Sequence, residues 1–228
     1  HGSYTPKGLY RTYPNLLTYE GVLGMEQGGR CKPENSNWLP FIRNAVGPMD
    51  FTPGTFDILY ENTCNSPRRK LWNCGPEVDM RVNTTLAKQI AEWVIIHSPV
   101  QMASDLIENY EGHPAFRFFR DFDADCDWSR ALAGEPGEFV AVVRRAGENY
   151  FLGAATDEQP RTLSLPLDFL KPGTKYRATI YADGPDADWK TNPTSYTISE
   201  REVSSADTLE VAMAPGGGQA VSFIPITD

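Results

Sequence analysis

The sequence predicts an α/β part followed by an all-β part, and the pattern changes near residues 110–114. Before this point, short apolar blocks alternate with stretches whose apolar residues recur at helical spacing, an alternation that favours a parallel sheet. After it, short apolar stretches are separated by turn sequences, which is typical of an antiparallel β-sandwich. We therefore expect one domain over residues 1–115 and a second over residues 116–228.

Two helices are expected in the first part. Apolar residues recur at helical spacing over residues 86–97, and Asn83 or Thr84 can cap a helix that runs through Trp93 and beyond. A shorter helix is expected over residues 38–46, because the Gly-Pro pair that follows would end it.

Strand positions are expected at two places in the first part and throughout the second. Residues 49–51 and 94–97 are candidates in the first part, although the second stretch could equally finish the long helix. The strands of the second part are expected at residues 139–144, 150–155, 161–165, 176–181, 195–201, 208–213 and 220–224. Glycine-containing turns at residues 146–149, 171–173 and 215–218 would separate several of them.

The composition is that of a globular chain with an acidic balance. Of 228 residues, 40% are hydrophobic, and the formal net charge is −9. This charge argues against nucleic acid or an anionic membrane as a partner, since both select for basic surfaces. No apolar run approaches the roughly 18 residues that a membrane span needs. The chain opens with His1 and shows neither an initiator Met nor a signal peptide, so we expect its natural start to lie upstream.

The cysteines give no metal-site pattern. Cys31, Cys64, Cys74 and Cys126 include no CxxC pair and no histidine at zinc spacing, so a zinc cluster is not expected. Cys64 and Cys74 flank a short loop, where they could be bridged in an oxidising compartment or remain free thiols. The sequence leaves these two alternatives open.

The most informative stretch is residues 14–26, which carries Glu20 and Glu26 among small and apolar residues. Six positions is too far for neighbours on one helical face, but Gly21 and Gly24 favour a turning backbone that could bring both carboxylates to one point. A metal ion or proton transfer would give the two acids a reason to be there. The alternative is a pair of solvated surface glutamates.

Four blocks of this sequence resemble the second half of the catalytic barrel of glycoside hydrolase family 97. They are residues 14–26 with their Arg-Thr-Tyr lead-in, 41–54, 84–90 and 98–105, in the family's order. The resemblance implies the C-terminal half of a (β/α)8 TIM barrel followed by the β-sandwich, with an upstream part of the same protein completing the barrel. It implies a calcium-dependent enzyme for an α-linked oligosaccharide or an α-galactoside, placed in the periplasm or secreted.

The same resemblance assigns roles to individual residues. Glu20 matches a ligand of Ca²⁺, while Glu26 matches a residue that both contacts the ion and acts as the general acid. His1 matches a histidine that hydrogen-bonds sugar hydroxyls. Gly2 stands where the inverting branch has its catalytic glutamate, so the resemblance points to the retaining branch, whose Asp nucleophile would lie before this chain.

The function expected from these residues is that of a retaining α-galactosidase. The alternatives are an inverting α-glucosidase of the same family and a non-catalytic carbohydrate-binding or scaffold protein. Two further residues have open interpretations. Asp50 is either a polar residue near the sugar site or a turn cap, and His97, on the apolar stripe of its helix, is expected to be a core histidine.

Overall fold

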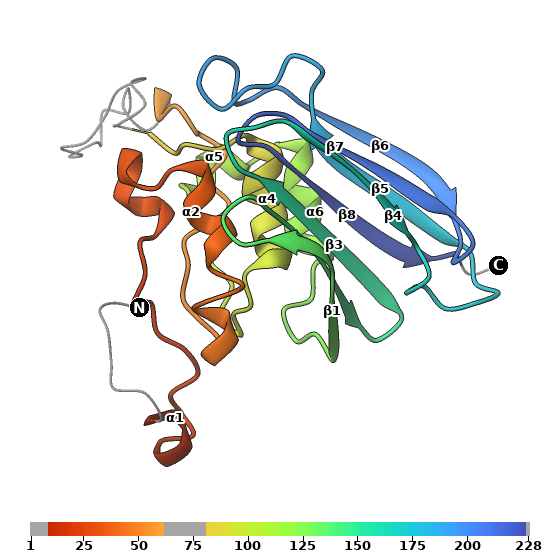
Figure 1. The fold of residues 1–228 in the computed structure, drawn as a ribbon, viewed down its shortest axis with the longest axis horizontal. Helices are drawn as coiled ribbons and strands as arrows, with labels where there is room; N and C mark the ends of the chain where they lie inside the picture. Colours follow the sequence, from red (N-terminus) through yellow and green to blue (C-terminus); the bar gives the residue numbers. More distant parts are fainter. Residues whose placement is uncertain (1–8, 62–80, 227–228) are drawn as a thin grey trace.

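The computed structural model describes residues 9–61 and 81–226, which form a helical part followed by a β part (Figure 1). The helical elements are α1 (Leu9–Thr12), η1 (Met25–Arg30), α2 (Pro33–Trp38), η2 (Asn44–Val46), α4 (Leu86–Ile95), α5 (Ile107–Tyr110), η3 (Pro114–Phe116) and α6 (Arg117–Asp121). The strands are β1 (Trp128–Glu135), β2 (Phe139–Ala146), β3 (Asn149–Thr156), β4 (Arg161–Pro166), β5 (Tyr176–Asp183), β6 (Tyr196–Val203), β7 (Thr208–Met213) and β8 (Gly218–Pro225). The boundary predicted at residues 115/116 falls within η3.

The β part is an antiparallel sandwich of two sheets, as predicted. One sheet has six strands in the order β1-β2-β3-β8-β5-β6, and the other pairs β4 with β7. Every strand expected in this part overlaps an observed strand. β1 was not predicted, because Trp128–Glu135 mixes polar and small residues and none of its side chains is fully buried.

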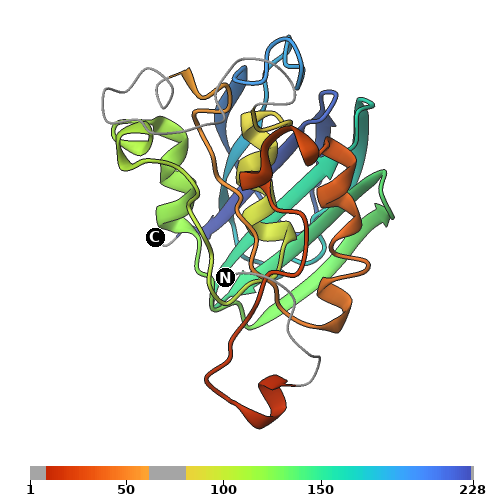
Figure 2. The same ribbon diagram turned by 90° about the vertical axis from the view of Figure 1, so that its left-hand side faces the viewer.

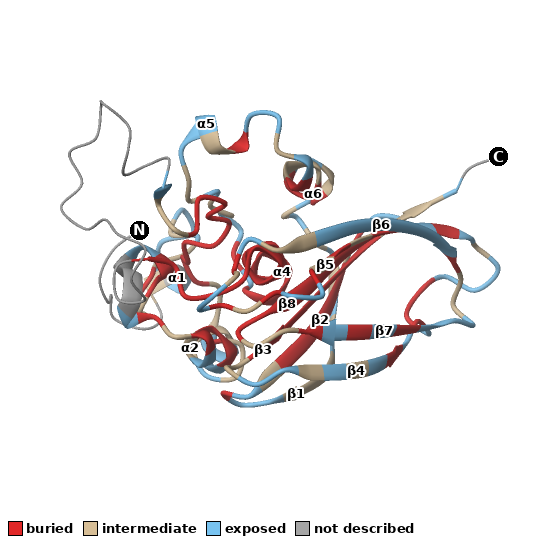
Figure 3. Cartoon of the chain, turned by 90° about the horizontal axis from the view of Figure 1, so that it is seen from above, coloured by how far each residue is buried: buried red, intermediate tan, exposed pale blue. Residues whose placement is uncertain are grey.

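The large sheet has a core on each face, which explains the continuous apolar sequence of its central strand β3. Tyr150 and Leu152 belong to the core shared with β4 and β7, whereas Phe151 and Ala155 belong to the core shared with the helical part. Successive side chains of a strand point to opposite faces, so a strand buried on both faces is apolar at every position. Figure 3 shows α4 on one side of this sheet and β4 and β7 on the other.

α4 packs closely against the large sheet because glycines face it. A Cβ atom at Gly153 would lie 2.5 Å from the carbonyl oxygen of Ala91, and one at Gly218 would lie 2.8 Å from Cα of Lys88. Figure 2 shows α4 (yellow) between the helical segments that precede it (orange) and those that follow it (green). Every residue of α4 is consequently buried, including its polar residues.

The helix boundaries differ in part from those expected. α4 is capped by Thr85, whose hydroxyl accepts the N–H of Lys88 at 3.3 Å, one residue beyond the predicted caps. The helix expected over residues 38–46 is divided: α2 starts earlier, with Pro33 at its first position, and a separate η2 ends at Gly47 with φ 139°. Proline suits a first helical turn, where its missing N–H costs no hydrogen bond.

No strand occurs in the described residues before Trp128, so the parallel sheet expected there is not seen. Residues 49–51 are extended rather than a strand, because they make one backbone hydrogen bond on each side. The N–H of Met49 donates to the carbonyl of His97 at 3.1 Å, and the N–H of Asp50 donates to that of Tyr19, also at 3.1 Å. Residues 94 and 95 form the end of α4, and the chain leaves the helix at Ile96. No helix in the described ranges has the length and apolar character that crossing a membrane requires.

Aromatic side chains join the end of the helical part to the sheet. Trp93 of α4 stacks on Phe119 of α6, with ring centroids 3.9 Å apart. Phe118 then meets Phe151 and Tyr181 of the sheet edge-on, at 6.2 and 5.4 Å. These large buried rings make the helical part and the sandwich share one core.

Candidate active site

Glu20 and Glu26 lie on either side of Gly24, in a segment whose backbone bends at residues 21–22. Gly21 has φ 66°, which lets the chain change direction directly after Glu20. A Cβ atom at Gly24 would lie 3.1 Å from Oε1 of Glu20 and 3.8 Å from Cγ of Glu26. Both side chains therefore border the space that this glycine leaves.

The environment of Glu20 opposes its ionisation. Its side chain is buried, and burial raises the pKa of its carboxyl group, with further increases from the negative charges of Glu26 and Asp50. Asp50 is itself buried, whereas Glu26 is exposed. A cation held between these carboxylates would offset both the repulsion and the loss of solvation.

The donors at this site suit a hard cation but do not complete a coordination sphere. Glu20 and Glu26 offer only oxygen atoms, the ligands that Ca²⁺ prefers, and Ca²⁺ takes six to eight of them. Within residues 9–61 and 81–226, no three His, Cys, Asp or Glu side chains are grouped so that they could hold a metal ion. A third acidic, His or Cys side chain for such a group would have to come from outside the described residues.

Arg43 fixes the backbone that carries Glu20. Its Nη2 donates to the carbonyl of Tyr19 at 2.8 Å, and its Nε donates to the carbonyl of Glu20 at 3.2 Å. The guanidinium also lies over the Tyr19 ring, 4.5 Å from its centroid. A third bond from Nη1 reaches Gly47 and so ties η2 to the same point.

The segment that follows Asp50 is held by two polar residues from other elements. Oε1 of Gln89 accepts the N–H groups of Gly54 and Thr55, at 2.9 and 3.2 Å. Oδ2 of Asp105 accepts the next two N–H groups, those of Phe56 at 2.7 Å and Asp57 at 2.8 Å. Four consecutive backbone donors are thus satisfied by two side chains, which fixes this segment beside Glu26.

A buried ionic network on α4 supports this arrangement. Nζ of Lys88 donates to the carbonyls of Pro33 and Thr156 at 2.7 and 2.9 Å, and to Oδ1 of Asn37 at 3.2 Å. Burial lowers the pKa of Lys88, while burial raises the pKa of Glu92 to about 7. Glu92 accepts a hydrogen bond from Nε2 of Gln89 at 3.1 Å and so helps to orient the side chain that holds Gly54.

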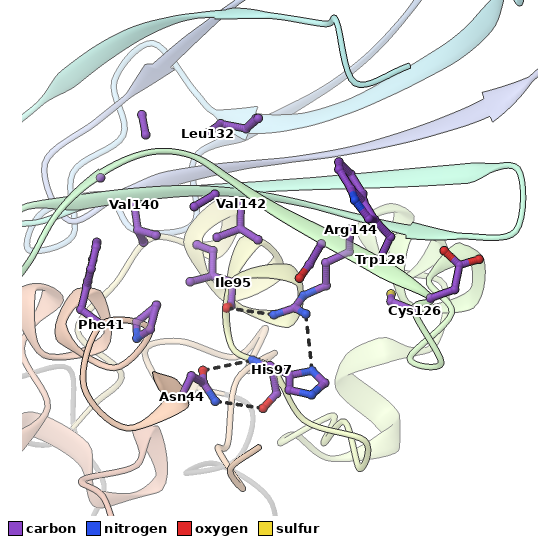
Figure 4. Close-up of a pocket in the computed structure, with 16 residues that line it drawn as sticks. Phe41, Asn44, Ile95, His97, Cys126, Trp128, Leu132, Val140, Val142 and Arg144 are labelled. Carbon is purple, nitrogen blue, oxygen red and sulfur yellow. Dashed lines mark hydrogen bonds between the residues drawn. The ribbon is translucent and has the colours of Figure 1, made fainter. Parts of the chain in front are cut away.

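His97 is not the core histidine that was expected. It lies beyond the C-terminus of α4 and is exposed, because the chain leaves the helix at Ile96. Figure 4 shows its ring at a groove of about 770 Å³ between β1–β2 and the segment around Phe41, with Nδ1 3.4 Å from Nη1 of Arg144. The guanidinium of Arg144 donates hydrogen bonds to the backbone oxygens of Val94 and Ile95, so it caps the C-terminus of α4.

The remaining candidate residues fall into two groups. Cys31 and Cys126 are free thiols, and burial raises the pKa of Cys31 to about 12, which makes its thiol unreactive at neutral pH. The others lie outside the described residues: His1, Gly2, Cys64 and Cys74.

Sequence reasoning did not find Arg43, Gln89 or Asp105. Arg43 reads as a surface cation, and Gln89 belongs to a polar stripe on α4 that periodicity assigns to solvent. Arg43 and Asp105 do lie within blocks 41–54 and 98–105, which carry the family resemblance. This position could have marked them as candidates, but it does not show what either side chain binds.

By fold and sequence the chain belongs to a family of glycoside hydrolases. Residues 125–224 match the family model described as "Glycosyl-hydrolase 97 C-terminal, oligomerisation". The chain is 33% identical over 230 residues to a protein of Bacteroides thetaiotaomicron named "Retaining alpha-galactosidase", an alignment that covers 98% of this chain and 33% of the relative. The predicted resemblance to glycoside hydrolase family 97 is therefore confirmed, and the sandwich is the C-terminal domain of that family.

Solved structures agree with this assignment. A family 97 enzyme from Pseudoalteromonas sp. strain K8, in complex with panose, superimposes with a TM-score of 0.85 at 41% identity, covering 96% of this chain and 33% of that one. The same enzyme in complex with acarbose gives a TM-score of 0.86. A β-arabinopyranosidase gives 0.76 at 25% identity. This chain spans about a third of the length of the curated relative and of these enzymes.

Proposed function

We propose that this chain is the acid-bearing part of a calcium-dependent retaining α-galactosidase. The observation that carries the proposal is the convergence of Glu20 and Glu26 on the space at Gly24. Two acidic side chains that border one space, of which one is buried and the other exposed, suit a metal ligand and a proton donor that reaches substrate. Glu26 would protonate the leaving glycosidic oxygen, and Glu20 would hold the ion.

Calcium fits this site through its preference for oxygen ligands. Glu20 and Glu26 would supply two of them, and a bound ion would contribute positive charge near the bond that breaks. The raised pKa of Glu20 supports the assignment, because a bound cation would offset both its causes, the burial of the carboxyl group and the negative charges of Glu26 and Asp50.

We further propose that the segments around Tyr19, Asp50 and His97 become consecutive strands of a (β/α)8 barrel in the complete protein, where an upstream part completes it. Asp50 is bonded to Tyr19 on one side, and its neighbour Met49 is bonded to His97 on the other. This spatial order follows the sequence order, as in a parallel barrel. The short length of the chain relative to its relatives is consistent with this view. Placement in the periplasm or outside the cell rests on the resemblance alone.

The retaining mechanism is supported by Gly2 and by the name of the curated relative. Glycine can neither activate water nor bind a metal, so the base of an inverting enzyme is absent from this position. Retention needs a nucleophile only about 5–5.5 Å from the acid, and that residue would come from the upstream part.

A second function is favoured by a different observation. The Pseudoalteromonas enzyme is more similar to this chain, at 41% identity, and its structures hold panose and acarbose. An inverting α-glucosidase is therefore the alternative, and a non-catalytic carbohydrate-binding protein is the third possibility. Hydrolysis of aryl α-galactosides and aryl α-glucosides by the product of the complete gene separates all three.

A further inference from the structure

Thr52 makes a hydrogen bond that connects the segment after Asp50 to the acid. Its Oγ1 accepts the backbone N–H of Glu26 at 3.1 Å, across 26 positions of sequence. Glu26 lies in the first turn of η1, where a backbone N–H has no intrahelical acceptor. The Thr52 hydroxyl therefore acts as a cap that comes from another part of the chain.

Thr52 is held rigidly, so it can position what it binds. Its side chain is buried. The residues just before it are bonded to Tyr19 and His97, and the N–H groups of Gly54 and Thr55 just after it are bonded to Gln89 of the buried helix α4. Because the backbone on both sides of Thr52 is held, its hydroxyl has a fixed place. The backbone of Glu26 is therefore held in a fixed position relative to α4.

Gly24 completes the arrangement by leaving room for both groups. A Cβ atom there would lie 3.0 Å from Oγ1 of Thr52 and 3.1 Å from Oε1 of Glu20. Such distances are below ordinary van der Waals contact, so a side chain at Gly24 would displace the hydroxyl or the carboxylate. The glycine is needed for space and not for an unusual backbone angle, since it is not among the glycines with positive φ.

We propose that Thr52 is a positioning residue for Glu26, which sets where the carboxyl group of the acid meets the glycosidic oxygen. The proposal rests on the function proposed above. It assigns to Thr52 no contact with substrate or metal, only the placement of the Glu26 backbone relative to Glu20.

The test replaces Thr52 by valine, which has the same shape but cannot accept the hydrogen bond, and by serine, which can. In the product of the complete gene, Thr52→Val should lower kcat on an unactivated α-linked disaccharide about 10- to 100-fold. It should lower kcat on an aryl glycoside with a good leaving group about twofold or less, because that reaction needs little protonation. Thr52→Ser should recover most of the lost rate. Equal losses on both substrates would overturn the proposal.

A readout that needs no turnover separates this inference from the proposed function. Amide hydrogen exchange at Glu26 should accelerate in Thr52→Val and not in Thr52→Ser. The matched control is Thr55→Val, since Thr55 is buried in the same segment but its hydroxyl donates to the carbonyl of Ser104 instead, at 3.1 Å. Unchanged exchange at Glu26 in Thr52→Val would refute the positioning role, even in an active enzyme. Accelerated exchange in a protein that cleaves no α-glycoside would uphold the hydrogen bond and refute the proposed function.

Discussion

The ammonium group of Lys88 donates a hydrogen bond to the carbonyl oxygen of Thr156 at 2.9 Å and so links α4 to the end of β3. The same group reaches Pro33 and Asn37 in α2. One buried cation thus joins three elements, and the helical part and the sandwich are expected to unfold together. This coupling matters for the candidate site, because α4 also holds the segment beside Glu26 through Gln89.

Replacing Lys88 by methionine should destabilise the protein strongly. Methionine fills similar space but leaves three buried oxygen acceptors without their donor and Glu92 without its positive neighbour. We expect the free energy of unfolding to fall by about 3 kcal/mol, measured by urea unfolding at pH 7. Lys171→Met is the control, since Lys171 pairs with Glu148 at the exposed surface and should change stability little. Similar effects of the two substitutions would contradict the role given to Lys88.

Stability should also depend on pH through Glu92. Burial raises its pKa from the ordinary 4.5 to about 7, so the folded chain binds this proton more tightly than the unfolded chain does. The resulting stabilisation is complete below pH 4.5 and is lost as the pH rises through 7, a change of about 3 kcal/mol. Glu92→Gln should therefore flatten the decline of the unfolding free energy between pH 5 and 8. Glu148→Gln, at an exposed position, is the control and should keep the decline. If the unfolding free energy of Glu92→Gln fell with pH as steeply as that of the wild type, the explanation would be wrong.

Gly153 should not tolerate even a methyl group. An alanine Cβ would lie 2.5 Å from the carbonyl of Ala91 and 2.9 Å from Cβ of Val94, so α4 would have to move away from β3. We expect Gly153→Ala to cost about 2–3 kcal/mol, seen as a lower Tm. Gly173→Ala serves for comparison, because Gly173 has open space around it and a φ of 78°. Gly173→Ala should lose only about 1 kcal/mol of stability, the strain of a non-glycine residue in the left-handed conformation. A smaller loss at Gly153 than at Gly173 would argue against the close packing.

The sandwich could be predicted because its strands carry the information locally. Two apolar runs and the glycine-containing turn between them mark the hairpin of β2 and β3. β1 could not be found in this way, because the sequence of Trp128–Glu135 does not alternate apolar with polar residues and none of its side chains is fully buried. The burial of the polar residues Lys88, Gln89 and Glu92 could not be predicted either. The periodicity of the sequence shows that one face of the helix is polar, but it does not show that other elements cover this face.

The candidate site was predictable to a similar extent. Two acids spaced by glycines indicated that Glu20 and Glu26 could meet, and both side chains border the space that Gly24 leaves. The residues that hold them in place come from distant positions, Arg43 at 23 and Thr52 at 26 residues' separation. Such contacts form only in the folded chain, and the sequence around Arg43 or Thr52 does not predict them.

Removing Glu20 should weaken calcium binding. Its buried carboxylate is proposed to hold the ion, and the neighbouring charges of Glu26 and Asp50 already favour a cation there. In the product of the complete gene, Glu20→Ala should reduce calcium affinity by about tenfold or more by isothermal titration. Glu34→Ala, at an exposed position in the first turn of α2, should leave it unchanged. Equal affinity in the wild type and Glu20→Ala would remove Glu20 from the site.

Substitution of Glu26 should separate substrates by their need for a proton. Glu26→Gln keeps the size of the side chain but cannot donate a proton as an acid, so hydrolysis of natural α-linked substrates should slow by about 10²-fold or more. Aryl glycosides with good leaving groups should be affected much less, because their leaving oxygen departs with little protonation. Equal losses on both would make Glu26 a purely structural ligand. Stereochemistry completes the test, since a chain with Gly2 in place of a base should release a product that keeps its α-configuration. An initial β-anomer in the NMR spectrum of the first-formed sugar would mean inversion and would favour the α-glucosidase alternative.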